Sequence, residues 1–500
     1  MVRASSAALL IAATLLQATA VVLCGIPATM TLERAFPTNH GVPMSQLRAR
    51  DKIRHGRMLQ SSKGVINLLL RINVSPKVQM LYYTTVKLGS PPREFHVQID
   101  TGSDVLWVSC NSCKGCPEST GLDIRLNSFD PKESSTSSNI SCSDKRCSVE
   151  LQSSDQSTCS YGDGSTTSGF YVSDLFYFDV ISGNGSVSTN SSAPIVFGPF
   201  VWNFGYVQQQ DDTANAVDGI FGFGQQNVSV ISQLSSQGVA PKAFSHCLIG
   251  DDTGGGTFVL GKIDDPSIVY TPLVPYQPRY NVNLQNITVN GKIVPNISEF
   301  FTTSSDQGTI VDSGTTLAYI AGVYYYPFID TIKSFIPNYT TPDDTLLDGF
   351  ECYEGITSIN DVFPQVGFHF AGGASMVLEP KDYLIQQKTT NRGQAWCIGF
   401  QFSNVEEITI LRDLVLKDKI IVYDLDAQRI GWTNYNCSRA VDVTANTRNG
   451  TETVTVQPTI ASSSSRDPSP NSGSSSRNEP SKLKPIYLCL FVMLISFLLI

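Results

Sequence analysis

The feature that most constrains the fold is a short motif that occurs once in each half of the chain. Residues 100–103 read Asp-Thr-Gly-Ser and residues 312–315 read Asp-Ser-Gly-Thr, and each copy follows an apolar, strand-like run. Each half also carries a later apolar pair, at residues 220–221 and 410–411. This repetition predicts a duplicated domain with one acidic turn in each half.

The body of the chain has a mostly-β pattern. Short runs of β-branched and aromatic residues alternate with clusters of turn residues, and helical periodicity is confined to short segments. A secreted lectin or sandwich protein would share this pattern, but it would leave the repeated motif unexplained. We predict strands at 81–88, 94–99, 105–109, 169–180, 257–260, 280–289, 309–311 and 420–423, and helices at 231–236 and 323–335.

The two acidic turns suit a hydrolytic carboxylate pair, formed by Asp100 and Asp312. Two carboxylates about 3 Å apart share one proton, because ionising both at that distance is costly. One of them then acts as a base on water while the other donates a proton to a carbonyl oxygen. This chemistry needs neither a metal nor a cofactor, and it predicts an acid pH optimum.

Each turn supplies three supporting residues. The Gly lets the backbone approach closely and offers its N–H to a carboxylate. The hydroxyl residue after the Gly is expected to orient the outer carboxylate oxygens, and the one before it to cross-link the two turns. The two glycines are Gly102 and Gly314. The hydroxyl residues after them are Ser103 and Thr315, and the hydroxyl residues before them are Thr101 and Ser313. A third Asp-Thr-Gly, at 252–254, follows no strand-like run and is expected to be a turn.

The N-terminal segments predict export and a pro-segment. Residues 1–24 combine Arg3, an apolar run and a small-residue cleavage site, as in a signal peptide; a first membrane helix is the alternative. Residues 25–75 hold eight basic and two acidic residues. Because the net charge of the whole chain is −9, the rest of the chain must be acidic. We interpret residues 25–75 as a basic pro-segment, with a linker as the alternative.

The C-terminal residues predict attachment to a membrane. Residues 438–473 are assigned to a Ser/Pro-rich linker and residues 474–500 to a removable glycosylphosphatidylinositol (GPI) attachment signal. The final apolar run, 486–500, falls short of the roughly 20 residues that span a bilayer, and a short tail anchor is the alternative.

Twelve cysteines also indicate an oxidising compartment. Without Cys24 and Cys489 in the two terminal segments, ten remain and predict five disulfides. The Cys-x-x-Cys-x-x-Cys run at 110–116 has no nearby His, so disulfides are favoured there over a metal site. Several Asn-x-Ser/Thr sequences fit a glycoprotein. The negative net charge argues against nucleic acid as a partner.

From about residue 76 to 437 the chain resembles the pepsin-like aspartic proteases, specifically the plant nepenthesin-like branch with a GPI-type tail. The resemblance is carried by Asp-Thr-Gly-Ser-Asp-Val-Leu-Trp-Val at 100–108, Asp-Ser-Gly-Thr-Thr at 312–316, Tyr-Gly-Asp-Gly-Ser at 161–165, Val-Asp-Gly-Ile-Phe-Gly at 217–222 and Phe-Ser-His-Cys-Leu at 244–248. It implies a bilobal fold of two β-barrel-like lobes, 76–255 and 256–437, with the active-site cleft between them.

The resemblance also implies roles for individual residues. Asp100 and Asp312 are similar to the catalytic pair, and Tyr161 resembles the tyrosine at the tip of a flap that closes over the substrate. Trp107 is similar to the indole that steadies this tyrosine. Cys352 and Cys397 resemble the disulfide of the C-terminal lobe.

One residue departs from the family pattern. Each family lobe has an apolar-apolar-Gly turn, which this chain keeps at 220–222, but the second half reads Ile-Leu-Arg at 410–412. If the position requires a positive φ or a close backbone crossing, Arg412 strains it. A guanidinium near Asp312 would also favour the ionised carboxylate. Alternatively, Arg412 points to solvent or pairs with Asp413 and the turn survives.

These observations predict a secreted, GPI-anchored, monomeric endopeptidase on the extracellular face of the plasma membrane, with polypeptide substrates. The alternative is a catalytically impaired protein of the same fold that binds or inhibits another protein at the cell surface.

Overall fold

A computed structural model gives the fold of the chain. It describes residues 28–34, 82–113, 116–120, 124–140, 157–160, 166–181, 187–203, 217–250, 254–295, 303, 307–314, 316–336, 350–388, 394–403, 407–447 and 450–460. The predicted signal peptide, the GPI signal, Tyr161 and Thr315 lie outside these residues. All described residues belong to one compact unit, which extends to Ala461.

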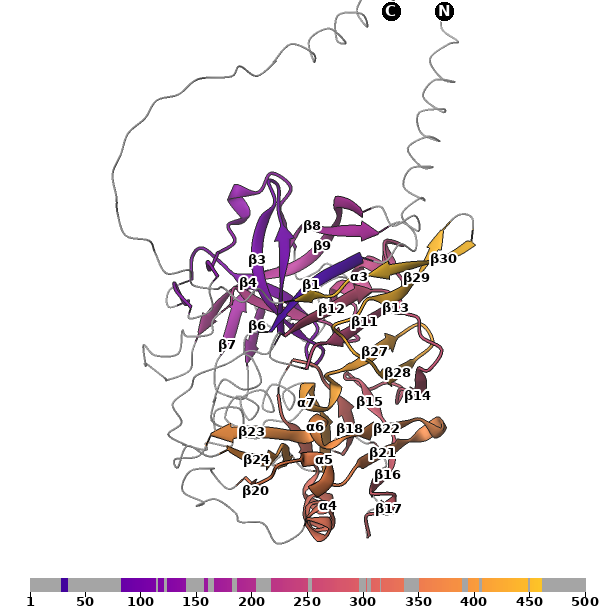
Figure 1. Cartoon of the computed structure of the whole chain (residues 1–500). Helices are drawn as coiled ribbons and strands as arrows, with labels where there is room; N and C mark the ends of the chain where they lie inside the picture. Colours follow the sequence, from indigo (N-terminus) through magenta and orange to yellow (C-terminus); the bar gives the residue numbers. More distant parts are fainter. Residues whose placement is uncertain are drawn as a thin grey trace, which may run out of the picture. The chain divides into compact units, whose positions relative to one another are not determined.

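Strands dominate this unit, which confirms the mostly-β prediction (Figure 1). Those of the first half are β1 (Ala28–Arg34), β2 (Tyr82–Leu88), β3 (Arg93–Asp100), β4 (Leu106–Ser109), β5 (Ser138–Asn139), β6 (Ser157–Ser160), β7 (Thr166–Gly169), β8 (Val172–Ile181), β9 (Val187–Asn203), β10 (Gly219–Gly222), β11 (Ala243–Leu248) and β12 (Gly255–Leu260).

The second half is built in the same way from many short strands. They are β13 (Lys262–Ile263), β14 (Val269–Pro272), β15 (Asn281–Val282), β16 (Leu284–Val289), β17 (Lys292–Ile293), β18 (Gly308–Val311), β19 (Ala318–Ile320), β20 (Cys352–Glu354), β21 (Val366–Phe370), β22 (Ser375–Leu378), β23 (Leu384–Lys388), β24 (Gln394–Ile398), β25 (Phe400–Phe402), β26 (Ile408–Leu411), β27 (Lys419–Asp424), β28 (Arg429–Asn434), β29 (Val441–Thr447), β30 (Gly450–Val456) and β31 (Thr459–Ile460).

Helices are few and short among the described residues. Both predicted helices are present, as α3 (Val230–Ser236) and α4 (Gly322–Phe335). Three single-turn helices follow, α5 (Ile359–Val362), α6 (Pro380–Tyr383) and α7 (Asp413–Leu416), together with 3-10 turns at Pro131–Glu133 and Ala371–Gly373. None of the described helices is long and apolar enough to span a bilayer.

The predicted duplication appears as the same three-stranded arrangement in both halves. In the first half, β10 runs parallel to β3 and antiparallel to β4, with Gly222 opposite Asp100. In the second half, β26 runs parallel to β18 and antiparallel to β19, with Leu411 opposite Val311. This register places Arg412 beside Asp312, where the first half has Gly222 beside Asp100.

A shared sheet and an aromatic cluster join the two halves. Strand β11 pairs with β27 along five residues, so the largest sheet contains strands from both halves. Phe244 on β11 stacks on Tyr423 of β27, with ring centroids 4.4 Å apart. Tyr280 packs edge-on against Tyr423, at 4.7 Å. These buried rings lie in one hydrophobic core that continues through both halves.

Two segments outside the predicted lobes contribute strands to the folded unit. β1 lies inside the predicted pro-segment and pairs with β12 along five residues and also with β2 and β8. The predicted linker begins at 438, but β29 and β30 form a hairpin that pairs with β13. Its alternating valines, Val441, Val443, Val454 and Val456, are buried, and this period of two residues is typical of a strand with one buried face.

Three disulfides link described cysteines. They join Cys352 to Cys397, as expected, Cys247 to Cys437, and Cys113 to Cys116. Cys110 is a buried free thiol, so the prediction that all ten body cysteines pair is wrong at this position. Asp252 and Thr253 of the third Asp-Thr-Gly lie outside the described residues, so the turn expected there stays a prediction.

The hairpin of β29 and β30 allows a matched test of its contribution to the folded unit. Val454 is 2% exposed, whereas the preceding Thr453 faces solvent. Val454→Asp places a carboxylate in the apolar cluster, and we expect it to lower the free energy of unfolding by about 3 kcal/mol or more. Thr453→Asp is the control and should change it by less than about 0.5 kcal/mol. Equal urea denaturation curves for the two variants would return residues 441–456 to the linker.

His246 on β11 predicts a pH dependence of stability. It is fully buried, and burial lowers its pKa from 6.5 to about 3. Between pH 6.5 and about pH 3, His246 is protonated in the unfolded chain but neutral in the folded chain. The free energy of unfolding therefore falls as the pH drops from 6.5 to about 3. We expect this loss to be about 1.4 kcal/mol per pH unit, and His246→Leu should remove it. Urea denaturation between pH 7 and pH 4 measures the two slopes; identical slopes would contradict the prediction.

Candidate active site

The structure brings the two predicted acidic turns together. Asp100 ends β3 and Asp312 follows β18, and both side chains are buried. A Cβ atom built on Gly102 would lie 2.9 Å from Oδ1 of Asp312 and 3.3 Å from Oδ1 of Asp100. The two carboxylates therefore border one small space, and the glycine is needed because any side chain there would fill it.

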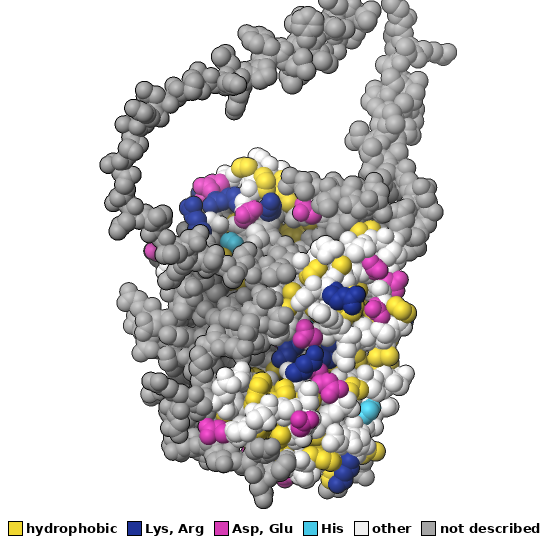
Figure 2. All heavy atoms as spheres, in the orientation of Figure 1, with side chains coloured by type: hydrophobic (Ala, Val, Ile, Leu, Met, Phe, Trp, Pro, Cys, Tyr) yellow, Lys and Arg dark blue, Asp and Glu magenta, His cyan; other side chains and the backbone are white. Residues whose placement is uncertain are grey.

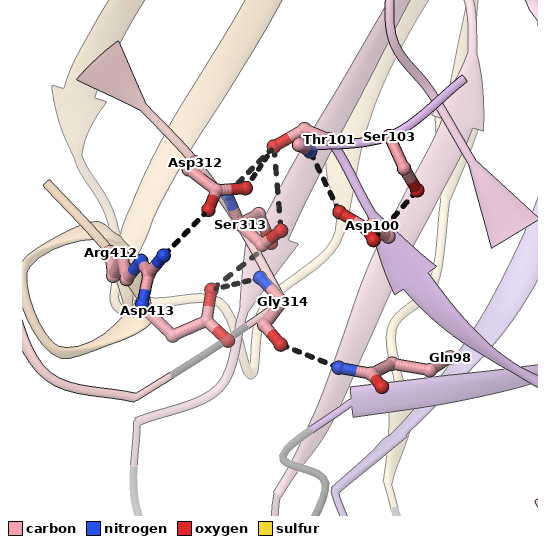
Figure 3. Close-up of polar contacts among 10 residues, drawn as sticks. Gln98, Asp100, Thr101, Ser103, Asp312, Ser313, Gly314, Arg412 and Asp413 are labelled. Atoms are coloured by element: carbon pink, nitrogen blue, oxygen red, sulfur yellow. Dashed lines mark hydrogen bonds and ion pairs between the residues drawn. The ribbon is translucent and has the colours of Figure 1, made fainter. Parts of the chain in front are cut away.

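Direct hydrogen bonds cross-link the two turns (Figure 3). The backbone N–H of Thr101 donates to the carbonyl of Ser313 at 3.2 Å, and the N–H of Ser313 donates to the Thr101 hydroxyl at 2.7 Å. The same hydroxyl lies 3.3 Å from Oδ1 of Asp312. Thr101 thus has the cross-linking position that the sequence predicts for it.

Asp100 has the neighbours expected from its own turn. The N–H of Gly102 donates to Oδ1 and the hydroxyl of Ser103 donates to Oδ2, each at 2.7 Å. These bonds fix the plane of the carboxylate and leave its Oδ1 edge facing Asp312. Such fixed orientation is what a reacting carboxylate needs.

The second turn differs from the predicted arrangement. Ser313 directs its hydroxyl to Oδ1 of Asp413 at 3.0 Å, and the N–H of Gly314 donates to the same oxygen at 3.2 Å. The predicted cross-link by this hydroxyl and the predicted donation from Gly314 to the catalytic carboxylates are therefore wrong. The physical reason is that Asp413, at the start of α7, is buried beside the turn and accepts both hydrogen bonds.

Sequence reasoning did not identify Gln98 as part of this site. Its side chain amide donates to the carbonyl of Gly314 at 2.5 Å and so adds a second link between the halves. Gln98 lies two residues before Asp100 on β3, so the period of a strand places both side chains on the same face. That spacing, together with a polar residue in an otherwise apolar run, was the available signal.

Arg412 is the most unusual residue of the site. Its guanidinium lies 3.3 Å from Oδ2 of Asp312, and its side chain is fully buried, so it does not point to solvent. The expected strain is absent: its φ is −123° and ψ is −172°, an extended conformation open to any residue.

The equivalent glycine of the first half shows why the two positions differ. A Cβ on Gly222 would lie 2.5 Å from the backbone of Asp104 and Val105, so this turn excludes a side chain by close packing. In the second half the turn survives with a side chain present. The guanidinium lies beside Oδ2 of Asp312 (Figure 3), whereas Oδ1 is the Asp312 oxygen nearest to the Cβ position of Gly102.

The sequence predicts that Tyr161 and Trp107 belong to a flap region, and only Trp107 is among the described residues. It is buried on β4 and packs in a small cluster with Tyr171, Val196, Ile220 and Val228. The expected relation between Trp107 and Tyr161 stays a prediction, because Tyr161 lies outside the described residues. Among the residues that are described, no cluster of His, Cys, Asp and Glu has the composition of a metal site.

Comparison with known proteins places this geometry in a family. Residues 82–262 match the family described as xylanase inhibitor N-terminal, and residues 279–434 match xylanase inhibitor C-terminal. Aspartic proteinase 36 of Arabidopsis thaliana is 38% identical over 412 residues, which cover 80% of this chain and 82% of that protein. The chain belongs to the pepsin-like aspartic protease family of plants. Aspartic proteinase 39 of the same plant is also 38% identical over 412 residues.

A solved structure supports the fold of this family member. Basic 7S globulin from soybean superposes with a TM-score of 0.55, covering 82% of this chain and 97% of the globulin at 15% sequence identity. At this identity the likeness concerns the fold alone. The chain therefore has the bilobal pepsin-like fold that the sequence predicts.

Thr101 provides a test of the link between the turns. Thr101→Val keeps the shape of the side chain but leaves the buried N–H of Ser313 without its acceptor, and we expect a loss of about 2–3 kcal/mol in unfolding free energy. Thr101→Ser keeps the hydroxyl and should lose less than half of that. Calorimetric unfolding compares the two; an equal loss would show that the methyl group, and not the hydroxyl, holds the turns together.

Proposed function

We propose that this protein is an aspartic endopeptidase that hydrolyses peptide bonds through a water molecule activated by Asp100 and Asp312. The observation that carries the proposal is the shared space above Gly102, which both carboxylates border. Fixed hydrogen bonds on Asp100 and the cross-linked turns give the pair the rigidity that such chemistry requires. The naming of relatives at 38% identity as aspartic proteinases supports the same proposal.

Each residue has a distinct role in this proposal. Asp100 and Asp312 share a proton and exchange it with water and substrate, while Thr101 and Gln98 hold the two turns in register. The flap role of Tyr161 and the orienting role of Thr315 belong to the proposal as well. Polypeptides are the proposed substrates, and neither a metal nor a cofactor takes part.

We further place the protein in the secretory pathway, anchored by GPI at the extracellular face of the plasma membrane. The apolar first 24 residues and the final apolar run support this location, as does a set of disulfides in the folded body. Release of the protein from membranes by a phosphoinositide-specific phospholipase would support the anchor, and retention after complete digestion would contradict it.

The proposal also treats the chain as a monomer without a nucleic-acid partner. On the face shown in Figure 2, cationic and anionic side chains of the described residues are interspersed. Lys262 and Arg429, which are partly exposed, both pair with the buried Asp424. A mixed surface offers no continuous basic patch for a phosphate backbone.

Active-site substitutions test the endopeptidase proposal. We expect the purified protein to cleave a denatured protein at acid pH, and Asp100→Asn and Asp312→Asn each to reduce kcat/KM at least about a thousand-fold. Asp426→Asn, at an exposed position, is the matched control and should retain the wild-type rate. Cleavage by the two active-site variants at the wild-type rate would overturn the proposal.

A second candidate is favoured by one observation, the buried ion pair between Arg412 and Asp312. If this ion pair prevents proton exchange, the protein is a catalytically impaired family member that binds or inhibits another protein at the cell surface. The family description as a xylanase inhibitor fits this candidate. A folded wild type that is inert between pH 2 and 8, together with an active Arg412→Gly variant, would establish it.

A further inference from the structure

Arg412 makes the two carboxylates electrostatically different. Its guanidinium lies 3.3 Å from Oδ2 of Asp312, and the exposed fractions of the two side chains are 0% and 1%. The guanidinium also lies 5.5 Å from the centroid of the Tyr319 ring. The cation is therefore held between a carboxylate and an aromatic ring in the protein interior, where a charge-charge interaction is weakly screened.

Asp100 lies in contrasting surroundings. Two of the donors to its oxygens, the Gly102 N–H and the Ser103 hydroxyl, are neutral. Gly222 occupies the register position that corresponds to Arg412, so the first half has no side chain at that place. An adjacent guanidinium stabilises a carboxylate anion more strongly than neutral donors do.

The other charged groups described around Asp312 do not cancel the electrostatic difference between Asp312 and Asp100. The antiparallel register of β15 and β18 places Arg279 opposite Asp312, and the hydrogen bond from the Val311 N–H to the Tyr280 carbonyl continues this register. Burial lowers the pKa of Arg279 to about 10, with Asp312 and Asp104 acting against this decrease, so Arg279 is a cation at acid pH.

Two further groups lie close to Asp312. Asp413 is a carboxylate beside the turn, and its Oδ1 accepts hydrogen bonds from the Ser313 hydroxyl and the Gly314 N–H. Burial raises the pKa of Tyr423, which therefore stays neutral. The groups described around Asp312 thus include Asp100, Asp413, Arg279, Arg412 and Tyr423, and Asp104 acts on Arg279.

We propose that Arg412 fixes the negative charge of the carboxylate pair on Asp312, so that the shared proton resides on Asp100. This inference rests on the proposed endopeptidase function and adds a division of roles to it. Asp312 is the base and Asp100 the acid, and Arg412 is a positioning residue that acts through Asp312.

The proposed steps conserve protons. Asp312 takes a proton from water, whose oxygen bonds to the scissile carbonyl carbon, while Asp100 gives its proton to the carbonyl oxygen. The resulting diol then loses a hydroxyl proton to Asp100, Asp312 gives its proton to the amide nitrogen, and the carbon-nitrogen bond breaks. Both carboxyl groups return to their initial state.

The inference predicts the effect of Arg412 on the pH profile. The guanidinium lies 3.3 Å from Oδ2 of Asp312, where it attracts the negative charge of the proposed base. Arg412→Gln removes this attraction. We expect the acid limb to move up by about one pH unit or more, and by more than the alkaline limb. Arg412→Lys keeps the charge and should retain most of the wild-type profile.

Arg93→Gln is the matched control, because it removes an arginine from an exposed ion pair with Glu133. It should leave both limbs in place. An acid limb of Arg412→Gln that coincides with that of the wild type would overturn the inference while leaving the endopeptidase proposal intact. A purely structural role of Arg412 would lower the rate at every pH without moving either limb.

A direct titration tests the inference without relying on turnover or on the folding of Arg412→Gln. In protein labelled with carbon-13 at the aspartate carboxyl groups, the Asp100 and Asp312 signals are assigned by their loss in Asp100→Asn and Asp312→Asn. As the pH of the wild type falls, Asp100 should take up its proton first. Protonation of Asp312 before Asp100 would overturn the inference, whereas an inert enzyme with the expected order would overturn only the endopeptidase proposal.

Discussion

The buried contact between residues 100–102 and 312–314 is the constraint on which the site depends. Both turns end buried strands, and their backbone groups bond directly to one another through Thr101 and Ser313. Buried N–H and carbonyl groups need partners, so the halves cannot separate without leaving these groups unsatisfied. The same contact brings the carboxylates to the space above Gly102. Structural stability and the arrangement of the acidic groups thus have one physical cause.

Arg412 shows how this constraint can accommodate a charged residue. A fully buried arginine is costly unless it is paired, and Asp312 supplies the partner in an ion pair of 3.3 Å. The chain thereby keeps the turn that follows β26, although its first half needs a glycine at the corresponding place. The consequence is an asymmetry: two halves related by duplication hold their carboxylates in unlike electrostatic surroundings.

The folded body extends beyond the two lobes that the motifs delimit. β1 pairs with β12 and β2, and the hairpin of β29 and β30 covers β13, so segments on both sides of the lobes contribute to the same unit. These contacts bury the valines of the hairpin and complete the edges of strands that would otherwise expose unpaired backbone groups. The folded unit therefore includes strands from both the predicted pro-segment and the predicted linker.

The sequence by itself determined the mostly-β pattern, both helices of more than one turn and the duplicated acidic motif. Three features could be predicted from local sequence: the repeated Asp-Thr/Ser-Gly, the strands around it and the two helices. Strands repeat their buried face every two residues and helices every three to four, so both leave a local pattern. The sequence also identified Arg412 as a departure from the family pattern. The direction of that side chain, the capture of the Ser313 hydroxyl by Asp413, the cross-link by Gln98 and the free thiol of Cys110 were decided only by tertiary structure. Each of these depends on which groups from distant parts of the chain meet in the interior. The local sequence does not specify these long-range contacts.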